Sequence, residues 1–245
     1  MSSKPKDDES PWGASLDKIR AWDPKGAELL SRVGMSPWTS GVLPRKEVEL
    51  IALALCCACT SLDDAGTRRQ IRAALDAGAT RDEILTTLKC GAGLAVHSCS
   101  LGAPILLEEM AATGAQAARG PNPETPACDA MRAIGQWNSA WDPFYELSPL
   151  WTDQFFAFGA SIYKSGVFSA RFMELMSIAL DASIRHMYAP GTRRHIKAAL
   201  AAGATPEEIM AALQICVSVG LGSCLRAVPL LAEELERSPS DSKKG

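Results

Sequence analysis

The stretch Gly166–Glu208 reads GVFSARFMELMSIALDASIRHMYAPGTRRHIKAALAAGATPEE, and a similar stretch occurs earlier in the chain. This duplication decides how the fold is organised. An earlier copy, Gly41–Glu83, reads GVLPRKEVELIALALCCACTSLDDAGTRRQIRAALDAGATRDE and aligns without a gap at a constant offset. Over the longer blocks Gly41–Met110 and Gly166–Leu235, about 27 of roughly 70 positions are identical, which is far more than chance produces. The duplication predicts two similar halves, and the differences between the copies should show where the function lies.

Helix signals are strong in both copies, whereas the alternation typical of strands is nowhere convincing. Thr205 is followed three residues later by Glu208, which is the pattern of an N-terminal capping box. Gly203 is placed to end the preceding helix, and Thr192 is placed to cap its start. The first copy repeats these three signals at Thr80, Gly78 and Thr67. The sequence therefore predicts an all-α fold.

Changes in composition divide the chain into two repeats, a linker and two tails. The linker is rich in Ala, Gly, Pro and Asn, and both ends of the chain are polar. We expect a disordered tail over 1–15, a first repeat over 16–114, the linker over 115–127, a second repeat over 128–236 and a disordered tail over 237–245.

The composition argues against several classes of protein. A net charge of −3 disfavours nucleic acid as a partner, because phosphate binding needs a basic face. The eight cysteines lack the spacing of a secreted disulfide scaffold and are typical of free thiols in a reducing compartment. Residues 1–10 lack the apolar core of a signal peptide, and we expect no apolar run long enough to span a bilayer. These features indicate a soluble cytoplasmic protein without a membrane partner.

The motif GTRRHIKAALAAGATPEEI, preceded by a helix that carries FMELMSIAL, resembles the carboxymuconolactone decarboxylase family. That family shares its helical fold with the alkylhydroperoxidase AhpD-like proteins. The first half carries the matching segments VELIALAL and GTRRQIRAALDAGATRDEI, so the resemblance covers both halves. It implies an AhpD-like helical fold in two tandem repeats. Because single-repeat members build trimers or hexamers, it also implies that a two-repeat chain forms a homotrimer.

The resemblance implies a lyase that decarboxylates a small carboxylated lactone or a related acid by general acid–base catalysis, in the catabolism of aromatic compounds. In the peroxidase branch of the superfamily, the glutamate is instead followed by C-x-x-C and a histidine. Here His186 stands at the first of these cysteine positions after Glu174, and Ala189 or Pro190 stands near the second. An AhpD-like thiol peroxidase, or a peroxiredoxin-type antioxidant enzyme, is therefore a less favoured alternative. A non-catalytic binding or assembly protein is a third.

Glu174 and Glu49 occupy matching positions on apolar helices. A carboxylate there is partly desolvated, which suits a general acid or base, although an arginine partner would give it a structural role instead. His195 follows Thr192 in the expected first helical turn, where the positive end of the helix favours a neutral imidazole that can take a proton. The first copy has Gln70 there, which caps a helix but does not titrate. The alternative for His195 is a surface histidine that only fills a capping position, and Gln70 supports that alternative. The resemblance to the carboxymuconolactone decarboxylase family nevertheless implies that His195 and Glu174 are catalytic.

Further residues of the second copy complete the predicted site. His186, at the end of the same helix, is a third candidate catalytic residue, and its counterpart in the first copy is Ser61. Arg193 and Arg194 are candidates to hold a substrate carboxylate in a guanidinium fork, or else to hold subunits together. Tyr188 adds a hydroxyl to the substrate-binding set.

The remaining histidine and the cysteines receive structural roles. His97 has Gly222 as its counterpart and lies in a Gly/Ala-rich segment, so we interpret it as a packing residue. Cys56, Cys57 and Cys59 fall within the apolar helix of the first copy, earlier than a peroxidase pair would. The sequence indicates neither a metal nor a cofactor. The expected partners are a small-molecule carboxylate substrate and other copies of the chain.

Overall fold

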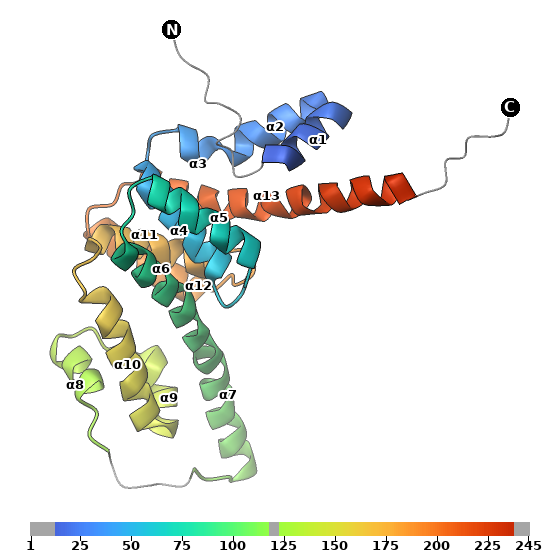
Figure 1. Cartoon of the computed structure of the whole chain (residues 1–245). Helices are drawn as coiled ribbons and strands as arrows, with labels where there is room; N and C mark the ends of the chain where they lie inside the picture. Colours follow the sequence, from blue (N-terminus) through green and yellow to red (C-terminus); the bar gives the residue numbers. More distant parts are fainter. Residues whose placement is uncertain (1–12, 118–122, 238–245) are drawn as a thin grey trace, which may run out of the picture.

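The computed structural model describes residues 13–117 and 123–237, and within these ranges every regular element is helical, with no strand (Figure 1). The predicted all-α fold is therefore confirmed. The predicted tails fall largely outside the described residues, as does the centre of the predicted linker. In chain order the elements are α1 (Gly13–Trp22), α2 (Pro24–Gly34), α3 (Ser36–Thr39), α4 (Arg45–Cys57), α5 (Asp64–Asp76), α6 (Arg81–Gly93), η2 (Leu94–Val96), α7 (His97–Thr113), α8 (Pro126–Ala133), η3 (Ser139–Trp141), α9 (Asp142–Leu147), α10 (Pro149–Tyr163), α11 (Ala170–Ala182), α12 (Ala189–Ala201) and α13 (Pro206–Arg237).

Two apolar helices, α4 and α11, form the centre of the core. In α4 every residue from Val48 to Cys56 is buried, and in α11 every residue from Leu175 to Asp181 is buried. The two helices occupy matching places in the copies and contact each other. The α5 and α6 helices pack on α4, while α12 and α13 pack on α11. The duplicated sequence therefore builds one continuous core with two related halves.

The outer helices are exchanged between the halves. The helices that precede the first copy, α1 to α3, contact α13 of the second copy, while α9 and α10, which precede the second copy, contact α7 and α6 of the first. In Figure 1, α7 and α13 project from the core in different directions, and each is accompanied by the helices of the other half. The outer helices that pack on each half therefore come, in sequence, from the other half.

The capping signals of the third helix in each copy are confirmed. Thr80 and Glu83 form a capping box at the start of α6. Thr205 and Glu208 make the same two hydrogen bonds at the start of α13, at 2.9 and 3.2 Å. The helix before each box ends at the predicted glycine, which adopts a left-handed backbone. These local signals fix where the third helix of each copy begins.

The predicted starts of the second helix in each copy are wrong by about one turn. The α5 helix is capped by the side chain of Asp63, and α12 has Pro190 in its first turn, so both helices begin before the threonines that we expected to cap them. Thr67 and Thr192 therefore lie inside these helices. As a consequence, His195 does not belong to a capping box and projects from the second turn of α12 instead.

Two continuous helical stretches are long and apolar enough, by length and composition, to cross a membrane, contrary to the expectation from the sequence. They are Arg81–Thr113, which comprises α6, η2 and α7, and Pro206–Arg237, which is α13. Sequence inspection missed them because small residues and a proline interrupt each apolar run. Only 17% and 33% of their apolar windows are buried within the chain, so much of this surface is available for contacts outside it.

Candidate active site

Glu174 and His195 meet between α11 and α12. His195 Nδ1 lies 2.6 Å from Glu174 Oε2, and the two side chains are only 12% and 15% exposed. They meet because α11 and α12 pack along each other and both residues lie on the facing sides. The sequence predicted this pair as catalytic, and the structure brings the two side chains into contact.

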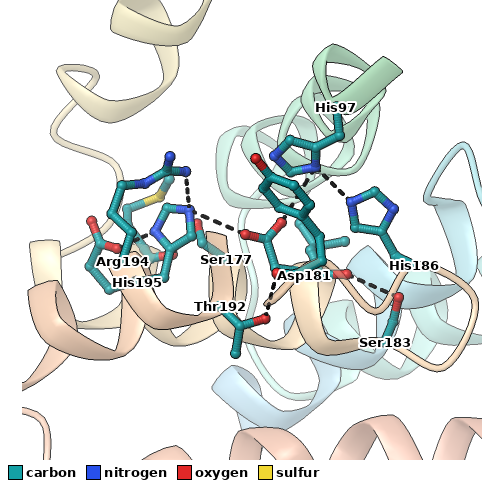
Figure 2. A network of polar contacts seen from close by, with 12 residues as sticks. His97, Ser177, Asp181, Ser183, His186, Thr192, Arg194 and His195 are labelled. Atoms are coloured by element: carbon teal, nitrogen blue, oxygen red, sulfur yellow. Dashed lines mark hydrogen bonds and ion pairs between the residues drawn. The ribbon is translucent and has the colours of Figure 1, made fainter. Parts of the chain in front are cut away.

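The hydrogen bonds determine which nitrogen of His195 carries the proton. An ionised carboxylate only accepts hydrogen bonds, so the Nδ1–H of His195 donates to Glu174. The Nε2 atom then keeps its lone pair, which accepts from Nη2 of Arg194 at 3.0 Å (Figure 2). A neutral imidazole that is oriented by a carboxylate, with its free nitrogen turned away from that carboxylate, has the arrangement of a general base.

Asp181 is a second acid on α11, about two turns after Glu174, and it is buried. Its Oδ2 atom lies 3.7 Å from His195 Nε2 and makes no hydrogen bond within the described part of the chain. Burial raises the pKa of Asp181 to about 6. Gly191, at the start of α12, leaves room for this carboxyl group, since a Cβ atom there would overlap it. Asp181 therefore faces the base nitrogen as an acid that exchanges its proton near neutral pH.

A pair of histidines lies on the other side of Asp181 (Figure 2). His97 belongs to α7 of the first half, and His186 belongs to the segment that follows α11. His97 Nδ1 lies 2.6 Å from His186 Nε2 and 3.7 Å from Asp181 Oδ1. The ring of Tyr188, a predicted substrate-binding residue, packs on His97 with centroids 4.0 Å apart. Burial lowers the pKa of both histidines, that of His97 to about 4, so both rings are neutral at pH 7.

The matching acid of the first half, Glu49, is held in a different way. Its side chain is buried, and its oxygens accept hydrogen bonds from Trp38 Nε1 at 2.9 Å, Arg45 Nε at 2.6 Å and Gln70 Nε2 at 3.1 Å. The residues at the corresponding positions of the second half are Tyr163, Ala170 and His195. Tyr163 forms its hydrogen bond with Ser177 instead, and the side chain of Ala170 has no donor. Glu174 therefore has only His195 as a hydrogen-bond partner among the described residues.

A cavity of about 110 Å³ is lined by Trp38 and Gln70, two of the hydrogen-bond donors to Glu49. Cys56, which is the counterpart of Asp181, and Gln70 line it, and an ion pair between Asp63 and Arg226 at 3.0 Å borders it. Gly222 also lines this cavity and is the counterpart of His97. The first half therefore lacks both the buried acid and the incoming histidine that the second half has.

The structure brings most of the predicted site together, but in two groups. His195, Glu174 and Arg194 form one hydrogen-bonded network. His186 belongs to a neighbouring group, because it bonds to a histidine of the first half and not to this network. Arg193 is exposed and makes no hydrogen bond or ion pair with the described residues. Among the two predicted arginines, geometry therefore favours Arg194 as the one that can receive a substrate.

Two residues of the site were missed by sequence reasoning. Asp181 had a usable signal, since an acid within the otherwise apolar stretch SIALDA is costly to bury without a purpose. His97 gave no such signal, and its interpretation as a packing residue omitted its contacts with His186 and Asp181. It reaches the site from α7, and only the exchange of outer helices shows that α7 lies there.

All eight cysteines are free. Burial raises the pKa of Cys56 and Cys57 to about 11, and that of Cys90 and Cys216 to about 12. Since the thiolate is the reactive form, these four thiols are poor nucleophiles at neutral pH. Cys56 and Cys59 are spaced as C-x-x-C, but the first is buried in α4 and the second is exposed beyond its end. Thiol chemistry has little support from this arrangement.

The fold and the site together define a class: helical tandem-repeat proteins in which one repeat holds a carboxylate–histidine pair. Residues 24–95 and 149–234 match the sequence model of the carboxymuconolactone decarboxylase family, and the chain belongs to that family. It is also similar to the crystal structure, at 1.70 Å, of a candidate gamma-carboxymuconolactone decarboxylase subunit from Burkholderia xenovorans LB400. That similarity has a TM-score of 0.83 and 30% identity, and it covers 97% of this chain and 100% of the other. A search of curated proteins found no match. The family and the tandem repeat predicted from the sequence are confirmed.

Proposed function

We propose that the chain is a decarboxylase-like carboxy-lyase that acts on a small carboxylated lactone or a related acid by general acid–base catalysis. The observation that carries the proposal is the 2.6 Å contact between Glu174 and His195, which leaves the other nitrogen of the imidazole as a base beside a guanidinium. Family membership supports the reaction class. The similar structure from Burkholderia xenovorans, which is described as a decarboxylase subunit, supports it as well.

Each side chain of the site has its own role in such a reaction. Arg194 leaves His195 and holds a carboxylate of the substrate through its guanidinium. His195 Nε2 takes a proton from the substrate or from water, and Glu174 stabilises the imidazolium that forms. The bond from carbon to a carboxylate breaks, CO₂ leaves, and the electron pair left on the substrate takes the proton from the imidazolium. This transfer returns His195 to its neutral form, and Asp181 faces the same nitrogen at 3.7 Å.

A turnover screen tests the proposal directly. Purified protein is incubated with a panel of carboxylated lactones and β-keto acids, and the release of CO₂ is measured. We expect turnover that depends on both Glu174 and His195. A folded wild-type protein that releases no CO₂ from any member of the panel would contradict the proposal.

A second candidate function, an AhpD-like thiol peroxidase, is favoured only by the C-x-x-C spacing of Cys56 and Cys59. The raised pKa of the buried Cys56 thiol argues against it. A parallel arm of the screen, with a peroxide and a dithiol as substrates, separates the two chemistries. Peroxide turnover that is lost when these cysteines are replaced would favour the peroxidase over the lyase.

We further propose that the chain works in the cytoplasm as a homotrimer, in which six repeats make a pseudo-sixfold arrangement. The support is a set of exposed apolar side chains at matching positions of α7 and α13, namely Ile105 with Leu230 and Leu106 with Leu231. Contacts between copies would remove this surface from water. Light scattering should give the mass of three chains, and a stable monomer at micromolar concentration would contradict the trimer. Binding to lipid vesicles would instead indicate that a membrane covers this surface.

A further inference from the structure

Three metal-binding atoms converge between the two halves of the molecule. His97, His186 and Asp181 each offer one ligand atom, and these three atoms all lie within 4.8 Å of one another. Figure 2 shows the three side chains turned toward one another. His97 comes from α7 of the first half, and the other two come from the end of α11 and the segment after it. We propose that these three side chains bind a divalent transition-metal ion.

The donor set suits such an ion. Two imidazole nitrogens and one carboxylate oxygen form the set that zinc and ferrous iron use when three protein ligands leave other positions open. An imidazole must be neutral to bind a metal; His97 is 12% exposed and His186 is partly buried, and burial favours the uncharged form. Soft thiolate ligands are not part of the set, so this chemistry is separate from that of the cysteines.

The spacing of the donors is close to what an ion requires. Ligand atoms bonded to a tetrahedral zinc at about 2.0–2.1 Å lie roughly 3.3 Å apart. His97 Nδ1 is 2.6 Å from His186 Nε2 and 3.7 Å from Asp181 Oδ1, and the three donors all lie within 4.8 Å of one another. An ion would therefore move the two imidazole nitrogens apart by less than an ångström and bring the most widely spaced donors closer together. His186 lies outside the helices, where a shift of this size meets little resistance.

Asp181 provides an independent reason to expect a cation. Its side chain is 3% exposed, and one of its oxygens, Oδ2, makes no hydrogen bond within the described part of the chain. A buried carboxylate without full hydrogen bonding is costly unless a positive charge compensates it. An ion at Oδ1 supplies that charge. Oδ2 faces His195, so the ion would be separated from the proposed base only by this carboxyl group.

The first half contains a natural control. The counterparts of Asp181, His186 and His97 are Cys56, Ser61 and Gly222, which leave no histidine at the matching place. Copying two of these residues into the proposed metal site, as His97→Gly and His186→Ser, replaces two ligands by the residues that the chain carries at the corresponding positions of the other copy. The inference does not depend on the proposed decarboxylase activity, because ion binding is measured directly.

The experiment titrates the full chain, freed of metal and of any purification tag, with Zn²⁺ by calorimetry and with Co²⁺ by absorption spectroscopy. We expect one ion per chain and a cobalt spectrum without the charge-transfer band of a thiolate ligand. Each single substitution should weaken binding by at least about 10-fold, the low end of what even an outer-sphere partner contributes, and the double substitution should abolish it. His195→Gln, and separately Cys59→Ser with Cys224→Ser, serve as matched controls that keep binding.

Nuclear magnetic resonance of the wild-type protein makes the test independent of the variants. The chain has three histidines, so their ring signals can be assigned from the single substitutions. Added Zn²⁺ should shift the ring nitrogens of His97 and His186 far more than those of His195. Absence of Zn²⁺ binding up to about millimolar concentration, where affinity is negligible, would overturn the proposal. So would binding that the double substitution leaves unchanged.

Discussion

The two halves of this molecule place a glutamate at the same position of the same buried helix and surround it in opposite ways. Glu49 in α4 accepts hydrogen bonds from an indole, a guanidinium and an amide, none of which exchanges a proton near neutral pH. Glu174 in α11 meets only the imidazole of His195 among the described residues. One duplicated position has thus become a fixed structural ion pair in one half and a carboxylate–histidine pair in the other.

The comparison shows that a few neighbouring residues decide what the glutamate at this position, which both halves share, can do chemically. The acid and the helix are the same in both halves, but Arg45 is replaced by Ala170 and Gln70 by His195. Gln70 also shows how the fold tolerates a neutral side chain at the histidine position, since its amide reaches Glu49 at 3.1 Å. In the second half, therefore, the glutamate bonds to a histidine and lacks the indole and guanidinium donors that hold Glu49 in the first half.

The largest expected effect comes from making the second half resemble the first. His195→Gln should lower turnover on a confirmed substrate by about 100-fold or more, the contribution that is typical of a general acid–base group. Folding should stay intact, because an amide already fills this place in the first half at Gln70. Gln70→His is the matched control and should have little effect, and near-wild-type activity of His195→Gln would falsify the assignment of the base.

The next effect is on stability as a function of pH, measured in the presence of a chelator. Folding raises the pKa of Asp181 to about 6 and lowers that of His97 to about 4. Between pH 4 and 6, the folded Asp181 binds more protons than the unfolded chain, so its contribution to stability falls as pH rises. The folded His97 binds fewer protons, so its contribution rises over the same range. In the wild type the two contributions oppose each other.

Single substitutions should separate these two contributions. In Asp181→Asn, the free energy of unfolding should rise from pH 4 to 6, and in His97→Gly it should fall, each by about 2 kcal/mol, since one pKa unit corresponds to about 1.4 kcal/mol. Urea unfolding at several pH values measures both slopes. Equal slopes in the two variants would show that these groups are not the opposing pair.

A smaller effect should distinguish the two glutamates. Glu49→Gln removes the charge that three donors satisfy in a buried site, and we expect a loss of about 1.5 kcal/mol in the free energy of unfolding. Glu174→Gln should cost less stability, because its carboxylate has a single partner, but it should impair turnover strongly. Denaturant unfolding and turnover of both variants give the comparison. If Glu49→Gln abolishes activity as fully as Glu174→Gln does, the first half is not merely structural.

The smallest effect on activity is expected from the thiols. Replacing Cys56, Cys57 and Cys59 together should change stability, because Cys56 is buried at the wall of the first-half cavity. Turnover should remain within about twofold, because none of these thiols belongs to the second-half site and Cys56 ionises only far above neutral pH. A well-folded triple variant without activity, together with a reducible disulfide in the native protein, would restore the peroxidase interpretation.

The sequence by itself determined the features that depend on local spacing. The gapless duplication, the all-α fold, the capping boxes at Thr80 and Thr205 and the family all follow from residues that are close together in the chain. The sequence also led to Glu174 and His195 as catalytic candidates, although their contact depends on the packing of α11 against α12. Helix periodicity and caps act over a few residues, so their signals remain visible in a single sequence.

Only the tertiary structure decided which residues complete the site. His97 lies 89 positions before His186 and reaches it because the outer helices are exchanged between the halves. The burial of Asp181, and the three donors that hold Glu49, likewise depend on how separate helices pack. Such contacts arise from the burial of apolar faces of the whole core, which is not directional and leaves no local motif in the chain.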